Sequence, residues 1–235
     1  MHPYLAECIG TCLLVSFGNG VVANTLLQHS KGRNGGWIVI SFGWAMAVFI
    51  GVFSAAPYSG SHLNPAVTIC FALLGKFDWS LVPGYILAQL VGAYIGATLV
   101  WLIYYPHFSR ENDPGATLAV FCTAPAIRSP FHNFLTEAIA TALFLLAVLF
   151  IVAPGNSLGA LDALPVALVV LAVGLSMGGP TGYAINPARD LGPRLAHATL
   201  PVAGKGASDW AYAWVPVAGP TAGAAIAALV FGWVT

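Results

Sequence analysis

Six long apolar stretches constrain the fold of this chain more than any other feature of its sequence. They cover about residues 4–27, 37–57, 82–105, 131–153, 160–178 and 211–234, with polar or Gly- and Pro-rich connections between them. A helix needs roughly 20 apolar residues to cross the hydrocarbon core of a bilayer. Only 7% of the residues are charged, whereas a soluble domain carries about 25%. We therefore predict an all-α, multi-pass integral membrane protein with six transmembrane helices in contact with the lipid bilayer.

The first apolar stretch is expected to be a true membrane span and not a cleaved signal peptide. It follows Met1, His2 and Pro3 directly, and Glu7 lies inside it. A signal peptide normally begins with a basic region, which is missing before this stretch.

The remaining composition argues against several kinds of partner. The formal net charge is zero and the basic residues are scattered, so nothing indicates a nucleic-acid partner. Cys8, Cys12, Cys70 and Cys122 show no metal-ligand spacing. We expect these cysteines to be small packing residues, and we expect neither a metal nor a cofactor.

Two shorter apolar runs, residues 65–75 and 187–199, are too short to span the membrane. At 1.5 Å per residue each covers roughly half of a ~30 Å hydrocarbon core. Gly-rich irregular chain precedes both runs, and irregular backbone is tolerated in a membrane only where it packs in protein or lines a wet cavity. Broken segments at matching places in two halves point to a site in the middle of the membrane. We therefore expect two re-entrant half-helices.

The two halves of the chain resemble each other. Residues 6–11, 63–66 and 89–93 are echoed in the same order by residues 136–141, 185–188 and 220–224. Three spans per half is an odd number, so the second half must be inverted in the membrane. We predict one channel domain over residues 1–235, with a first repeat at 1–105, a connecting loop at 106–130 and a second repeat at 131–235.

Each half-helix begins with the same three residues, which are Asn64-Pro65-Ala66 and Asn186-Pro187-Ala188. Asn is a strong N-cap and Pro suits the first helical position. In an inverted repeat the two N-termini face each other at the midplane of the pore, where their positive ends oppose cations. Each Asn amide can donate to a passing oxygen, which disfavours a proton wire. The backbone carbonyls of Gly60, Ser61, His62, Ala184 and Ile185 are expected to supply acceptors along the pore.

On these motifs the chain resembles the major intrinsic protein family, the aquaporins and glycerol facilitators, essentially from end to end. The most specific segments are Ser59 to Thr68 and Gly182 to Pro193. The resemblance implies the aquaporin fold, a passive channel for small neutral solutes, no enzymatic activity and a homotetramer. The compact chain suits a bacterial inner membrane.

The resemblance also implies a selectivity filter built from four positions, which are Trp44, Gly174, Tyr183 and Arg189. An Arg inside a membrane helix is costly and usually faces a wet cavity. Its fork of donors can hold hydroxyl oxygens and repel cations. The alternatives are an Arg189 paired structurally with Asp190 and a Trp44 that lies in the core or at the bilayer surface.

Gly174 indicates the glycerol-facilitator branch, because water-selective members usually carry His there. Without that bulk, Trp44 and Tyr183 form an apolar corner opposite Arg189, which suits glycerol and other small polyols, along with water and urea. Asp190, Arg194, the Pro216-Val217 pair and the long connection at 106–130 agree with that branch. The alternative is a water-selective aquaporin.

Several residues are expected to support the pore, and Asp190, directly after Arg189, is one of them. Glu7 and Glu137 occupy equivalent places in the repeats, and we expect each to accept hydrogen bonds from the re-entrant loops; the alternative is a proton relay. His62 is expected to orient its loop, with a pH sensor as the alternative. The GxxxG pairs at residues 92–96 and 219–223 predict close helix crossings.

A membrane enzyme or coupled transporter is the alternative from another class. The sequence offers no nucleophile–base pair, and Ser59 and His62 lack a third partner. Orientation is ambiguous from charge. A count of basic residues would place the loops holding Lys31, Arg110 and Arg128 in the cytoplasm, whereas the resemblance implies the reverse, and we follow the resemblance.

Overall fold

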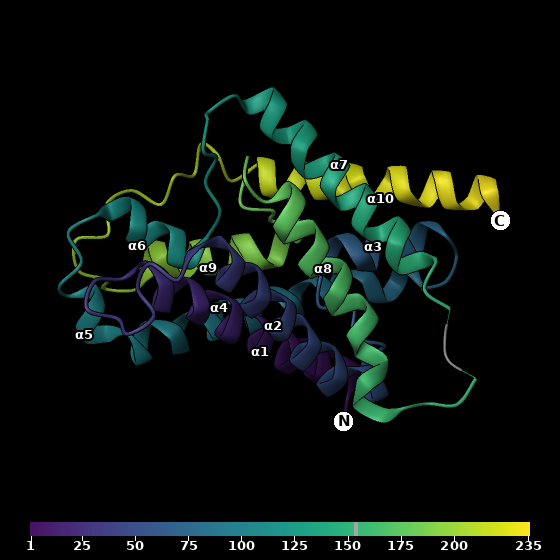
Figure 1. The fold of residues 1–235 in the computed structure, drawn as a ribbon. Helices are drawn as coiled ribbons and strands as arrows, with labels where there is room; N and C mark the ends of the chain where they lie inside the picture. Colours follow the sequence, from purple (N-terminus) through teal and green to yellow (C-terminus); the bar gives the residue numbers. More distant parts are fainter. Residues whose placement is uncertain (153–154) are drawn as a thin grey trace.

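The computed structural model describes residues 1–152 and 155–235. The described residues form helices and connecting loops, with no strand among them (Figure 1). The expected end of the fourth span at residue 153, and the start of the connection that follows it, lie outside the described residues.

Six helical segments are long and apolar enough to cross a membrane within the described part of the chain. They are α1 (Pro3–Leu26), α2 (Gly36–Ser59), α4 (Val82–Ile103), α7 (Pro130–Leu149), α8 (Leu164–Met177) and α10 (Val215–Val234). Short 3₁₀ turns, η1 (Trp79–Leu81) and η2 (Gly159–Ala163), lengthen α4 and α8 at their N-termini. Large apolar side chains point outward, such as Leu87 at 63% and Leu229 at 74% exposed. In water such a surface would be unfavourable, whereas in a bilayer it contacts lipid.

Two differences from the expected boundaries have local causes. The last span starts at Val215 and not near residue 211, because residues 210–214 form turns. The long connection between the repeats is partly helical, with α5 (Tyr105–Phe108) and α6 (Pro114–Phe121). Asp113 caps α6, since its carboxylate accepts from the Gly115 N–H at 2.8 Å, and Pro114 occupies the first helical position.

The two half-helices are α3 (Pro65–Leu73) and α9 (Pro187–Thr199). Each packs against the last span of the opposite repeat, α3 against α10 and α9 against α4. Each also contacts the other half-helix. The repeats therefore interlock and do not form two separate bundles.

Small residues allow the first and last spans of each repeat to cross closely. A Cβ added to Gly92 on α4 would lie 2.2 Å from the Cys8 carbonyl oxygen of α1. In the second repeat, a Cβ on Gly223 of α10 would lie 2.4 Å from the Ala138 carbonyl oxygen of α7. Figure 1 shows α7 and α10 side by side. The close crossings predicted from the two GxxxG pairs are confirmed.

Candidate functional site

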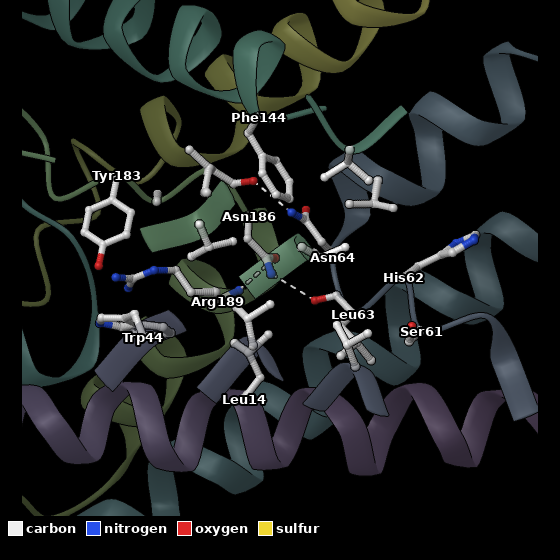
Figure 2. A pocket seen from close by; sticks show the side chains of 18 of the residues that line it. Leu14, Trp44, Ser61, His62, Leu63, Asn64, Phe144, Tyr183, Asn186 and Arg189 are labelled. Atoms are coloured by element: carbon white, nitrogen blue, oxygen red, sulfur yellow. Dashed lines mark hydrogen bonds between the residues drawn. The ribbon is translucent and has the colours of Figure 1, made fainter. Parts of the chain in front are cut away.

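A cavity of about 160 Å³ passes between the two half-helices. Most of the residues singled out from the sequence line it: Trp44, Gly60, Ser61, His62, Asn64, Tyr183, Ala184, Ile185, Asn186 and Arg189. The other lining residues are apolar: Leu14, Val48, Val52, Leu63, Val67, Phe71, Phe144, Val148, Val166 and Val170. Figure 2 shows Trp44, Tyr183 and Arg189 gathered at one end, Ser61 and His62 at the other, and the two asparagines between them.

Asn64 and Asn186 cap their half-helices and lie 5% and 6% exposed. The Asn64 side-chain oxygen accepts from the Ala66 N–H at 2.9 Å. The Asn186 oxygen accepts from the Ala188 and Arg189 N–H groups at 3.0 and 3.2 Å. Side-chain capping of this kind satisfies amides that a helix start leaves unpaired.

Each of these two side-chain amides also donates a hydrogen bond to the loop of the other repeat. Asn64 Nδ2 donates to the Ile185 carbonyl at 2.8 Å, and Asn186 Nδ2 donates to the Leu63 carbonyl at 2.9 Å (Figure 2). An amide nitrogen carries two N–H donors, so each keeps one for a solute oxygen. The Ile185 carbonyl, expected to serve the pore, therefore also fixes Asn64. The Leu63 carbonyl does the same for Asn186, although the sequence did not predict a role for Leu63. Leu63 directly precedes Asn64 just as Ile185 directly precedes Asn186, and this matching position could have indicated the role.

The loops before the two asparagines share an unusual backbone. In the first, Gly60, Ser61 and Leu63 have φ of 77°, 52° and 52°. In the second, Gly182, Tyr183 and Ile185 have φ of 80°, 39° and 42°. Positive φ is uncommon for residues other than Gly and persists only where the surroundings hold it.

Two buried carboxylates accept hydrogen bonds from these loops. Glu7, fully buried, accepts from the His62 and Leu63 N–H groups at 2.9 and 2.7 Å. Ser59 Oγ and Gln89 Nε2 donate to it at 2.7 and 2.8 Å. Four donors therefore converge on one carboxylate, which stabilises its charge in the interior.

Glu137 has the matching position in the second repeat and is also fully buried. It accepts from the Ala184 and Ile185 N–H groups at 3.0 and 2.9 Å, and from Thr181 Oγ1 at 2.6 Å. Because these three donors, all from residues 181–185, account for the burial of the Glu137 carboxylate, they favour a supporting role for Glu137 over a proton relay.

His62 is held by its neighbours. Its Nδ1 lies 3.1 Å from Thr68 Oγ1. Its ring packs against Phe71, Phe77 and Tyr85, with centroid separations of 5.2, 4.7 and 5.1 Å. These contacts suit a residue that orients its loop.

At the filter end, Arg189 lies over the ring of Trp44, with its guanidinium carbon 4.1 Å from the ring centroid. Arg189 is 8% exposed, Trp44 4% and Tyr183 3%. The ion pairs of the described residues do not include one between Arg189 and Asp190, which was the alternative for Arg189. Asp190 instead forms an ion pair with Arg194 at 2.9 Å.

That ion pair is buried and joins three segments. Asp190 also accepts from the N–H and Oγ1 of Thr123, at 2.8 and 2.6 Å. Arg194 donates to the carbonyls of Thr123, Ser208 and Asp209 at 2.9, 2.8 and 3.1 Å. The pair anchors α9 to the connecting segment after α6 and to the loop before α10. Asp190 and Arg194 therefore fix the half-helix that carries Arg189.

Gly174, predicted as a filter residue, lies behind Tyr183 and is not among the described residues that line the cavity. A Cβ there would lie 2.9 Å from Cζ of Tyr183. The missing side chain thus leaves room for the Tyr183 ring, and it is this ring that borders the pore. Among the described residues, no group of three His, Cys, Asp or Glu side chains is placed to hold a metal ion.

The model of the major intrinsic protein family matches residues 1–231. The chain belongs to the major intrinsic protein family. Within the family, it is 54% identical over 233 residues to the probable glycerol uptake facilitator protein of Thermotoga maritima, covering 99% of both chains. It is 49% identical to glycerol uptake facilitator protein 3 of Lactiplantibacillus plantarum, covering 97% of this chain and 94% of the relative.

A family member of known structure, the aquaglyceroporin from Plasmodium falciparum, superposes with a TM-score of 0.86. The two chains are 33% identical, and the match covers 97% of this chain and 93% of the other. The expected fold, with six spans and two half-helices, is confirmed.

Proposed function

We propose that the chain is a passive channel for glycerol and other small uncharged polyols, which also passes water and urea and excludes ions and protons. The observation that carries this proposal is the proposed filter, where the guanidinium of Arg189 lies over the Trp44 ring and Tyr183 lies beside it. A polyol has a carbon side and a hydroxyl side. Aromatic rings suit the first, and the donors of Arg189 suit the second.

The rest of the cavity repeats this division. Apolar side chains line it together with the Asn64 and Asn186 amides and the loop residues before each asparagine. A solute that leaves water needs replacement hydrogen bonds, because an unpaired hydroxyl in an apolar setting is costly. The polar groups spaced along the cavity supply those bonds to each hydroxyl in turn.

Exclusion of cations and protons rests on charge at two levels. Arg189 carries a positive charge at the end of the cavity that also holds Trp44 and Tyr183. The N-termini of α3 and α9 add their positive dipole ends at the asparagines. A water that accepts from both Asn amides cannot easily relay a proton through that point.

The alternative is a water-selective channel, and Gly174 argues against it. With no side chain at this position, the Tyr183 ring packs back against α8. The names of the most similar relatives also favour glycerol.

We further propose a homotetramer in the plasma membrane of a bacterium, with the filter end outside. The bacterial relatives support the membrane, and the family supports the assembly and the orientation. We also propose that residues 1–105 and 131–235 are the two repeats of one channel domain, joined by the connection at 106–130. The matching loops and carboxylates support this division.

Stopped-flow light scattering on proteoliposomes tests the function. Glycerol gradients should relax far faster than in empty liposomes, and a pH gradient should persist. A glycerol rate equal to that of empty liposomes, alongside fast water flow, would instead support the water-selective alternative.

A further inference from the structure

Trp37 lies on α2 seven residues before Trp44, about two helical turns and roughly 10 Å along the axis. Seven residues bring two side chains back to nearly the same helix face. Both tryptophans line a second hollow of about 320 Å³ next to the filter, together with Tyr183 and Arg189. A solute on its way to the filter therefore passes Trp37.

The Trp37 indole is fixed by a hydrogen bond to another helix. Its Nε1 donates to the Gly174 carbonyl at 2.8 Å. Gly174 lies in the last turn of α8, where carbonyls lack partners within the helix. Trp37 satisfies one of them. An interfacial tryptophan that only anchors a span needs no partner of this kind.

The Trp37 ring also contacts Tyr183. The two ring centroids are 5.8 Å apart and the planes meet at 74°, an edge-to-face arrangement. Both rings pack closely against Gly178, the residue that caps the C-terminus of α8. A Cβ on Gly178 would lie 2.5 Å from Trp37 Cζ2 and 2.6 Å from Tyr183 Cδ1. The Tyr183 hydroxyl forms no hydrogen bond of normal geometry with the described residues, although the Ser41 hydroxyl on α2 lies close to it. The position of the ring therefore depends largely on packing, and Trp37 supplies one of the packing contacts.

From these contacts we propose that Trp37 positions Tyr183 and thereby sets the size limit of the filter for linear polyols. Without Trp37 the Tyr183 ring is free to move toward the hollow that Trp37 now occupies, and the filter widens. This inference rests on the proposed function, because it assumes that polyols pass the filter.

The test compares permeabilities for glycerol, four-carbon erythritol and five-carbon xylitol in proteoliposomes. The erythritol-to-glycerol ratio should rise at least about fivefold in Trp37→Ala, which corresponds to about 1 kcal/mol of barrier. Trp37→Phe keeps an aromatic edge and should restore most of the discrimination. Because each ratio is taken within one preparation, the amount of active protein does not affect it.

Trp79→Ala is the matched control, since Trp79 is 54% exposed and precedes a span without lining either hollow. Its ratio should equal that of the wild type. An unchanged ratio in Trp37→Ala, in a protein that conducts glycerol, would overturn the inference and leave the proposed function intact. A wild type that conducts no glycerol would overturn both. If Trp37→Ala does not fold, Trp37→Leu carries the same expectation.

Discussion

The two re-entrant loops have the same backbone but different side chains. Positive φ occurs at four, three and one residues before the asparagine in both loops, and a buried glutamate binds the two amides before each asparagine. Three places before the asparagine, the first loop carries Ser61 and the second Tyr183. Three places after it, the first half-helix carries Val67 and the second Arg189.

This difference separates two tasks. The shared backbone positions the paired asparagines, and this part depends on no particular solute. We propose that the side chains that distinguish solutes are Tyr183 on the second loop and Arg189 on α9, with Trp44 of the first repeat packed against Arg189. Solute choice should therefore respond to changes around the second loop and remain insensitive to changes in the first.

The largest expected effect lies one place further along α9, where Asp190 corresponds to Thr68 of the first half-helix. Asp190→Asn leaves the buried Arg194 without its countercharge, which should cost about 3–5 kcal/mol of unfolding free energy. Thr68→Val removes only neutral hydrogen bonds and should cost about 1–3 kcal/mol. Thermal unfolding in detergent measures both.

Arg128→Ala is the control for that comparison. Its ion pair with Asp209 is on the surface, with the Arg128 side chain 53% exposed, so its loss should cost at most about 1 kcal/mol. An Asp190→Asn protein as stable as Arg128→Ala would contradict the anchoring role of the pair.

Replacing each buried glutamate by glutamine should affect glycerol and water permeability differently in the two loops. Glu137→Gln leaves hydrogen-bond donors of the second loop poorly paired, and each such donor should cost about 1–3 kcal/mol of stability. The disturbed loop should lower glycerol permeability more than water permeability. Glu7→Gln disturbs the first loop and should lower both in proportion. A larger shift of the glycerol-to-water ratio in Glu7→Gln would reverse the assignment of the loops.

A methyl group behind the filter should have an intermediate effect. Gly174→Ala places a Cβ 2.9 Å from Tyr183 Cζ, and overpacking of this kind costs about 1–3 kcal/mol. The ring should shift into the pore and reduce glycerol permeability about tenfold, with a smaller effect on water. Gly179→Ala is the control, because a Cβ there meets no atom within 4 Å. Equal permeabilities in these two variants would refute the packing argument.

The smallest effect is expected for Tyr183→Phe. The hydroxyl forms no hydrogen bond of normal geometry with the described residues, and its nearby partner Ser41 is itself unpaired, so its removal should change glycerol permeability by less than about twofold. A large loss, measured in the same flux assay, would mean that the hydroxyl itself binds the solute.

The half-helices, their asparagine caps and the two glutamates were predictable because each depends on a short motif and its repeat. The roles of Leu63 and Trp37 were not recognised. Leu63 acts through its carbonyl, which its side chain does not reveal, although the repeat aligns it with Ile185. Trp37 acts through α8, a contact between segments 137 residues apart that no local pattern encodes.

The position of Gly174 was also only partly predictable. The sequence indicated that a bulky residue is missing there, but it could not tell which neighbour takes the space. Packing against α8 decides this, and the Tyr183 ring fills it. Likewise, Arg194 was noted only as a marker of the branch, because its acceptors at residues 123, 208 and 209 lie in irregular segments.

The most direct test of this separation is the glycerol-to-water permeability ratio in proteoliposomes, measured for a filter variant and a first-loop variant. The double variant Trp44→Phe with Gly174→His should lower the ratio at least about tenfold, equivalent to about 1.4 kcal/mol. Ser61→Ala, in the first loop, should leave it unchanged. Equal loss of glycerol and water flux in the double variant, or a comparable shift of the ratio in Ser61→Ala, would contradict the proposal that Tyr183, Arg189 and the residues packed around them select the solute.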